Sequence, residues 1–140
     1  MTWPIEYKRA SQDFETFMIL ARDAAGLATT NMAWNMVEGV LHVFRRRLTI
    51  LQAIAFANVL PPVLRALFLD NWHPCEPPEP FCARELLYQE VRALRHEHNF
   101  SPPDAIESVS AALWQCVDAV ALRKVLEGFP PEAAGFWRLH

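Results

Sequence analysis

With 140 residues the chain has the length of one domain, because folding at this size buries roughly two-thirds of the unfolded surface without disulfides or metals. Its formal net charge of −3 argues against general nucleic-acid binding, which needs a basic face that displaces counterions. The odd count of three cysteines favours free thiols in a reducing cytoplasm. Asn58, Pro61, Pro62 and Arg65 interrupt the longest apolar run, which excludes a membrane span there.

The N-terminal part of the sequence predicts two long helices. Ser11 can cap the first, and Gly26 stands where a left-handed residue would end it. Thr29 or Thr30 can cap the second, in which Gly39 indicates a close crossing with another helix. Apolar residues recur at helical spacing in both segments. They are Phe14, Phe17, Met18, Ala21 and Ala25 in the first, and Ala33, Val37, Val40, Leu41, Phe44 and Leu48 in the second.

A third helix is predicted to follow at once. Thr49 and Gln52 have the spacing of a capping box, in which the threonine oxygen accepts a bond from an amide and the glutamine reaches back to the cap. Pro61 ends this helix and Pro62 can begin a short one, because proline lacks a donor that only the helix interior needs. The expected core residues are Leu51, Ile54, Ala55 and Val59 before the prolines, and Val63, Leu64, Leu67 and Phe68 after them.

The rest of the chain predicts a similar set of helices. A stiff, extended linker with four prolines comes first, at residues 73–80. A helix is then expected over about residues 82–96, followed by one capped by Ser101, one capped by Asp118 and a short one that begins at Pro131. No segment shows the period-two alternation of a strand, so the predicted fold class is all-α.

The sequence also predicts an internal duplication. Two stretches run in step without a gap when Leu60-Pro61-Pro62 is set over Phe129-Pro130-Pro131. In this register the predicted helix caps Thr49 and Asp118 coincide, and the apolar phases of the preceding helices agree. We therefore predict two pseudo-repeated helical halves packed into one bundle-like domain and joined by a proline-rich strap. The predicted parts of the 1–140 domain are residues 1–72, the linker 73–80 and residues 81–140.

Several short motifs are shared with a known family. The central ones are Arg46-Arg47-Leu48-Thr49, Ala55-Phe56-Ala57, Val59-Leu60-Pro61, Leu64-Arg65 and Trp72, with Pro4-Ile5-Glu6-Tyr7 before them and Pro-x-x-x-x-Phe-Trp, ending at Trp137, after them. Together they resemble the bacterial family called domain of unknown function 2267, over nearly the whole chain. The resemblance implies a small helical bacterial protein. It implies no activity and no cofactor, because the family has none assigned.

A metal site is one chemical hypothesis. His73 and Cys75 are two residues apart and Cys82 is near, and zinc takes four nitrogen or sulfur ligands in a tetrahedron. No Cys-x-x-Cys pair is present, and His96 and His98 would point to different sides of a helix. We therefore interpret these residues as solvated histidines and incidental thiols, and we expect no metal and no cofactor.

Three further side chains are candidates for a ligand site. Glu38 interrupts the apolar second helix and His42 lies one turn on, so they could form a general base with its orienting group or an ordinary surface pair. Arg47 and Arg65 each lie close to a corner of the predicted repeat, where an arginine can bond carbonyl groups at a helix end, and a structural role is expected for both. A buried arginine that faces an anionic ligand is the alternative. Cys116, on an apolar helix far from any histidine in sequence, is interpreted as an inert thiol.

The functional hypotheses follow from these patterns. The sequence shows no phosphate-binding loop and no nucleophile beside a base, and its apolar fraction is 52%. This favours a non-enzymatic module that binds a protein partner or forms a homodimer. The alternative is a small-molecule sensor or enzyme with a pocket between the halves near Glu38, His42 and Arg65. A third hypothesis is binding to an anionic surface through the basic run 45–47 together with Lys8 and Arg9.

Overall fold

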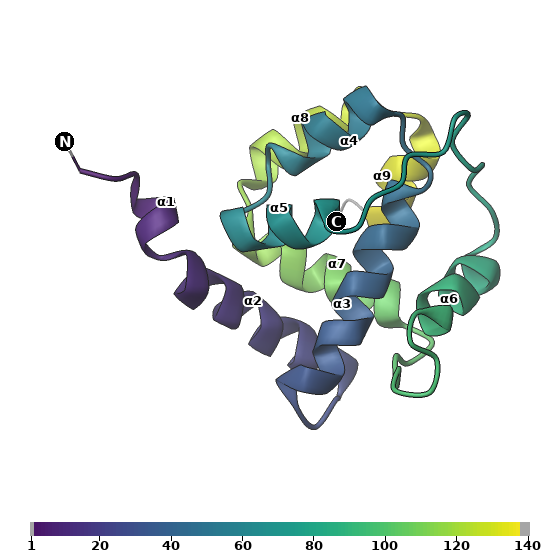
Figure 1. Ribbon diagram of the computed structural model, residues 1–140, viewed down its shortest axis with the longest axis horizontal. Helices are drawn as coiled ribbons and strands as arrows, with labels where there is room; N and C mark the ends of the chain where they lie inside the picture. Colours follow the sequence, from purple (N-terminus) through teal and green to yellow (C-terminus); the bar gives the residue numbers. More distant parts are fainter. Residues whose placement is uncertain (1, 138–140) are drawn as a thin grey trace.

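The computed structural model describes residues 2–137, and no strand occurs among them, so the predicted all-α class is confirmed. Figure 1 shows α1 at the edge of the molecule, before the start of α2. Within residues 2–137, every helix is too short or too polar to cross a membrane. The helices are α1 (Ile5–Lys8), α2 (Ala10–Ala25), α3 (Thr30–Arg45), α4 (Ile50–Ala57), α5 (Pro62–Leu69), α6 (Arg84–Ala93), α7 (Ala105–Cys116), α8 (Ala119–Glu127) and α9 (Pro131–Trp137).

Several helix ends have the predicted chemistry. The capping box of α4 is complete: Thr49 Oγ1 accepts a hydrogen bond from the Gln52 amide (3.1 Å), and Gln52 Oε1 accepts one from the Thr49 amide (2.9 Å). Thr29 Oγ1 accepts from an amide in the first turn of α3. Asp118 does the same for α8. Gly26 ends α2 with a φ of 67°, in the left-handed region that glycine adopts without strain.

Two predicted helix starts are wrong. Ser11 lies inside α2, because the chain is already helical in α1 and only Arg9 separates the two helices. Ser101 does not cap α7; it is buried, and both its amide and its hydroxyl donate to Asn99 Oδ1. The two prolines after Ser101 delay the helix, so Asp104 takes the cap position. Helix α6 is also shorter than the predicted range 82–96.

The buried side of α4 also differs from the prediction. Leu51 and Ile54 were expected in the core but are 80% and 47% exposed, whereas Ala53, Phe56 and Ala57 are buried. Seven of the eight residues of α4 are apolar, so the spacing of its apolar residues does not show which side is covered. Contacts with α5 and α8 decide it instead.

The first long helix of each half packs against the other half. α2 lies on α7, and α6 lies on α3, while α4 runs against α8 (Figure 1). The starts of α4 and α8 are 69 residues apart, at Ile50 and Ala119, and so are the starts of α5 and α9, at Pro62 and Pro131. This is the offset of the sequence alignment. The duplication itself stays a prediction, which a superposition of residues 1–72 on 81–140 would test.

An aromatic cluster fills the place where the two halves meet. The ring centroid of Phe44 lies 4.9 Å from those of both Phe56 and Phe136, and the ring of Trp137 stacks on Phe56 at 5.6 Å. Phe68 joins through Phe56 at 5.1 Å. All five side chains are buried. Each such pair contributes about 0.5–1.5 kcal/mol beyond burial alone, so the cluster ties α3, α4, α5 and α9 together.

Gly39 is the point at which α3 meets α6. A Cβ atom added to it would lie 3.0 Å from the carbonyl oxygen of Val91 and 3.1 Å from Val91 Cγ1. A Cβ atom at this distance would be in tight contact with Val91 and would require α6 to shift by a few tenths of an ångström, as the sequence predicted for a close crossing.

We predict that Gly39→Ala destabilises the fold by about 1 kcal/mol or more, because backbone atoms of α6 must shift to admit the methyl group. Gly135→Ala in α9 is the matched control, since an added Cβ there meets nothing within 4 Å. The control should gain up to about 1 kcal/mol from the better helix propensity of alanine. Urea unfolding measures both. Equal stabilisation by the two substitutions would contradict the close crossing.

Candidate functional site

One face of α3 carries a row of polar side chains. Glu38, His42 and Arg45 are spaced by about one helical turn, so they lie on the same side of the helix. They are 8%, 7% and 7% exposed, respectively, and the last two bond to the end of α5. Buried polar groups need hydrogen-bond partners and are often functional, so these three side chains are candidates for a functional site.

Glu38 is held by an aromatic neighbour on its own helix. The indole Nε1 of Trp34 donates to Glu38 Oε2 at 2.8 Å. No hydrogen bond joins Glu38 to His42 in the described part of the chain. The two side chains share a face, but they do not form the directly bonded base and orienting group that general-base catalysis would use.

His42 braces the end of α5. Its Nε2 lies 2.9 Å from the carbonyl oxygen of Leu67, so Nε2 carries the proton and donates. Burial lowers the pKa of the His42 ring, and the nearby charge of Arg45 lowers it further, against the opposing effects of the Leu67 carbonyl and Glu38. The neutral ring with its proton on Nε2 is therefore the stable form in the folded chain.

Arg45 binds carbonyl groups that follow Leu67 in the chain. Its Nη1 donates to the carbonyl oxygens of Phe68 (2.7 Å) and Asp70 (2.8 Å), and its guanidinium carbon lies 5.8 Å from the ring centroid of Trp72. Burial, followed by repulsion from Arg46, lowers the pKa of Arg45 to about 10 despite the attraction of Asp70. The guanidinium thus stays charged at neutral pH although it is buried.

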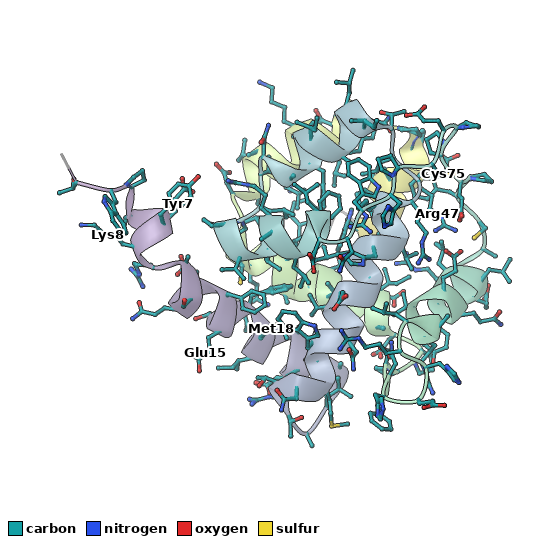
Figure 2. All side chains as sticks on the ribbon, viewed as in Figure 1. Tyr7, Lys8, Glu15, Met18, Arg47 and Cys75 are labelled. Carbon is teal, nitrogen blue, oxygen red and sulfur yellow. The ribbon has the colours of Figure 1, made fainter. Side chains whose placement is uncertain are left out.

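Arg47 has the most bonds of the basic run. It donates to the carbonyl oxygens of Val43 (2.9 Å) and Pro80 (3.3 Å) and to both carboxylate oxygens of Glu90. Burial opposes its charge, but the bond and charge of Glu90 outweigh burial and raise the pKa of Arg47. The same contacts lower the pKa of Glu90 in spite of burial. Figure 2 labels Arg47 near the linker that carries Cys75.

The basic run therefore has no common exposed surface. Arg45 and Arg47 are buried, and only Arg46 is exposed, where it donates to Glu90 at 3.0 Å. The sequence did not predict the burial of Arg45 and Arg47, since their partners lie up to 43 residues away in the chain. This arrangement removes the continuous patch that the anionic-surface hypothesis requires.

Arg65 has the structural role that the sequence predicted at the proline corner. Its Nε donates to the carbonyl oxygen of Ala57 and its Nη2 to that of Leu60, both at 3.0 Å, at the end of α4. It lines a groove of about 390 Å³ together with Asp13 and Cys116. No hydrogen bond or ion pair joins Arg65 to Glu38 or His42 within residues 2–137.

The candidate metal ligands are divided between two places. His73 and Cys75 are exposed and line a small pocket at the end of α3, whereas Cys82 is half-buried with its sulfur 3.7 Å from Arg47 Nη2. No group of three or more potential metal ligands gathers among the described residues. Burial and the charge of Asp13 raise the pKa of the Cys116 thiol, which favours the unreactive protonated form.

Comparison with models of known protein families gives a match. The model of a family described as "Uncharacterized conserved protein (DUF2267)" matches residues 14–136. This confirms the resemblance drawn from the central motifs. The matched region begins in α2 and so leaves out α1. A search of curated proteins finds no significant match.

We predict that His42 makes the stability of the fold sensitive to mild acid. Because its folded pKa is lowered from about 6.5, the unfolded chain binds more protons below that pH, and stability is lost as the pH falls. His42→Gln keeps an N–H donor for the Leu67 carbonyl but does not titrate. The free energy of unfolding between about pH 5 and 7 should then depend less on pH than in the parent chain. His73→Gln, at an exposed histidine, is the matched substitution control. An unchanged slope in His42→Gln would show that the ring is not the cause.

Proposed function

The chain belongs to the uncharacterised DUF2267 family, and we propose that it is a non-enzymatic helical module that self-associates through the outer face of α4. One observation carries this proposal. A helix with a single polar residue, such as α4, is normally covered, but its residues Ile50, Leu51 and Ile54 are 40%, 80% and 47% exposed. Covering them in an interface would remove this apolar surface from water, which stabilises the assembly by about 25 cal/mol for each Å² buried.

The neighbouring helix α8 carries a further exposed apolar residue. Val120 of α8 is 72% exposed, and it stands 69 residues after Leu51, at the equivalent position of the predicted repeat. α8 lies against α4. We refer to Ile50, Leu51, Ile54 and Val120 together as the α4 surface. Exposed apolar residues at equivalent positions of both halves favour an interface over chance exposure of single apolar side chains.

A second copy of the chain is the partner that suits this surface best. α4 contains no charged residue, so two copies can face each other without like-charge repulsion. A dimer with twofold symmetry needs only a self-complementary patch. A stable interface buries about 800 Å² on each partner, so residues around the α4 surface must also contribute.

The N-terminal arm is the second exposed apolar surface. Trp3, Ile5 and Tyr7 are each at least half exposed, and α1 has no buried residue. Figure 2 shows Tyr7 and Lys8 on this arm, which touches the main body where Arg65 Nη1 donates to the Tyr7 hydroxyl at 3.4 Å. The arm lies outside the family-matched residues 14–136, so we assign the shared interface to α4 and not to the arm.

The polar groups of the candidate site support a structural role. Glu38, His42 and Arg65 bond to an indole and to carbonyl groups at helix ends, which leaves no nucleophile beside a base. We accordingly favour a binding module over a sensor or enzyme with a pocket near these three residues. We place the module in the cytoplasm on the grounds of its odd number of cysteines.

We predict a dimer of the parent chain, with about twice the 16.0 kDa mass of one copy. Leu51→Glu should convert it to a monomer, because each interface would then bury two unpaired carboxylates. The side chain is mostly exposed in one copy, so the circular dichroism spectrum should not change. Light scattering over a concentration series measures the mass.

Two controls separate the exposed surfaces. Leu86→Glu changes a residue that is 52% exposed on α6, away from α4, and should leave the dimer intact. Trp3→Ser tests the arm and should also leave it intact. A monomeric parent chain at high micromolar concentration, or a dimer that survives Leu51→Glu, would contradict the proposal.

A further inference from the structure

The end of the last short helix of each half is bonded in the same way by two different side chains. Arg45 Nη1 donates to the carbonyl oxygen of Phe68 at 2.7 Å, and Trp114 Nε1 donates to that of Trp137 at 2.8 Å. Both the donors and the acceptors are 69 residues apart. A neutral indole is therefore sufficient for this bond. Arginine at position 45 adds a buried positive charge, which the bond does not require and which is costly to desolvate.

Arg45 also has donors that the fold does not use. Both of its hydrogen bonds come from Nη1. Its Nε is buried and has no partner, and its Nη2 takes part in no bond within residues 2–137. The residue is 7% exposed, and among the described residues it has no carboxylate within ion-pair distance. A buried guanidinium with unpaired donors usually has an anionic partner.

A small pocket lies against this guanidinium. It has a volume of about 220 Å³, and the end of α3 and the segment after α5 line it. Arg46 contributes a second positive charge, and Asn71 and His73 contribute further polar side chains. The ring of Trp72, under the Arg45 guanidinium, forms an apolar wall. The pocket is smaller than the roughly 300 Å³ of typical ligand sites, so it suits one compact group.

The charges around the pocket leave it positive. Asp70 is the nearest acid, but its side chain is exposed to solvent, and Asn71 Nδ2 donates to it at 3.4 Å. Water weakens the interaction of such an exposed carboxylate with Arg45. Glu90 is already bonded to both Arg46 and Arg47. Burial and then the charge of Arg46 lower the pKa of Arg45, and the attraction of Asp70 and Glu38 offsets them only in part.

We propose that this pocket binds a phosphate group, with Arg45 and Arg46 as its charged ligands and Asn71 and His73 as additional donors. The donors around the pocket come from different parts of the chain and therefore from different directions. The four oxygens of a phosphate can accept bonds from several directions, whereas a carboxylate has only two oxygens, both in one plane. Arginine is the side chain that recognises such oxyanions most specifically. The site is independent of the α4 surface, which lies on other helices.

The experiment titrates the full chain with inorganic phosphate at constant ionic strength, balanced with sodium chloride. The indole N–H signal of Trp72 in a proton–nitrogen correlation spectrum reports occupancy. We expect a saturable shift. Arg46→Gln should weaken binding by about tenfold or more, because one charge-assisted contact is lost. Arg46 is exposed, so this variant should fold normally. Arg45→Gln should abolish binding.

Lys124→Gln is the matched control, since it removes one positive charge from an exposed site on α8 and should leave the affinity unchanged. The bound group could be free phosphate or part of a phosphate ester, and a parallel titration with methyl phosphate separates these two ligands. Tighter binding of methyl phosphate than of inorganic phosphate identifies the ligand as an ester, and weaker binding identifies it as the free ion. The site would be disproved by shifts that chloride reproduces, or by an equal loss of affinity in Lys124→Gln. Acetate binding as tight as phosphate binding would overturn the assignment to phosphate.

Discussion

The buried guanidinium of Arg47 joins three parts of the chain that are distant in sequence. It bonds to Val43 in α3, to Pro80 in the linker and to Glu90 in α6. The linker is fixed a second time by the Glu79 amide, which donates to the Arg46 carbonyl oxygen at 3.0 Å. Losing one partner of a buried ion pair costs about 3–5 kcal/mol, and the partial exposure of Glu90 reduces that figure. Total stabilities are only about 5–15 kcal/mol, so this contact is a substantial part of the whole.

The position of α6 follows from this contact. With the linker and Glu90 held at the end of α3, α6 crosses α3 at Gly39, where an added Cβ atom would lie only 3.0 Å from the Val91 carbonyl oxygen. α2 meanwhile covers α7, so the first long helix of each half shields the second long helix of the other. Each half therefore needs the other to cover its apolar faces. The rings of Phe44, Phe56 and Trp137 pack against one another in the core between the two halves.

Local chemistry explains what the sequence could predict. The caps at Thr29, Thr49 and Asp118 depend on residues within one turn, and Gly26 depends on its own backbone, so all four were correct. The buried side of α4 depends on which neighbours cover an apolar helix, and the prediction of Leu51 and Ile54 in the core was wrong. Arg45 and Arg47 are buried because distant carbonyl and carboxylate groups receive them. No spacing in the sequence indicates those partners.

The two buried arginines at the end of α3 therefore differ: Arg45 is the last residue of the helix and Arg47 lies two residues beyond it. Arg47 has a carboxylate partner and connects the halves, whereas Arg45 has only carbonyl partners and keeps unused donors beside a pocket. The donors of Arg47 have protein partners without any ligand, whereas the unused donors of Arg45 would be satisfied by a bound anion. The apolar surface on α4 is separate from both, which allows a phosphate site and an interface to coexist on one small helical chain.

A double-mutant cycle for Arg47 and Glu90 tests this account most directly. Urea unfolding would be measured for the parent chain, Arg47→Met, Glu90→Gln and the double variant. If the pair holds α6 and the linker on α3, each single change should be costly and the double change should cost less than their sum, by a coupling energy of about 1–3 kcal/mol. Strictly additive losses would contradict the account, because Arg47 and Glu90 would then contribute to the fold independently of each other.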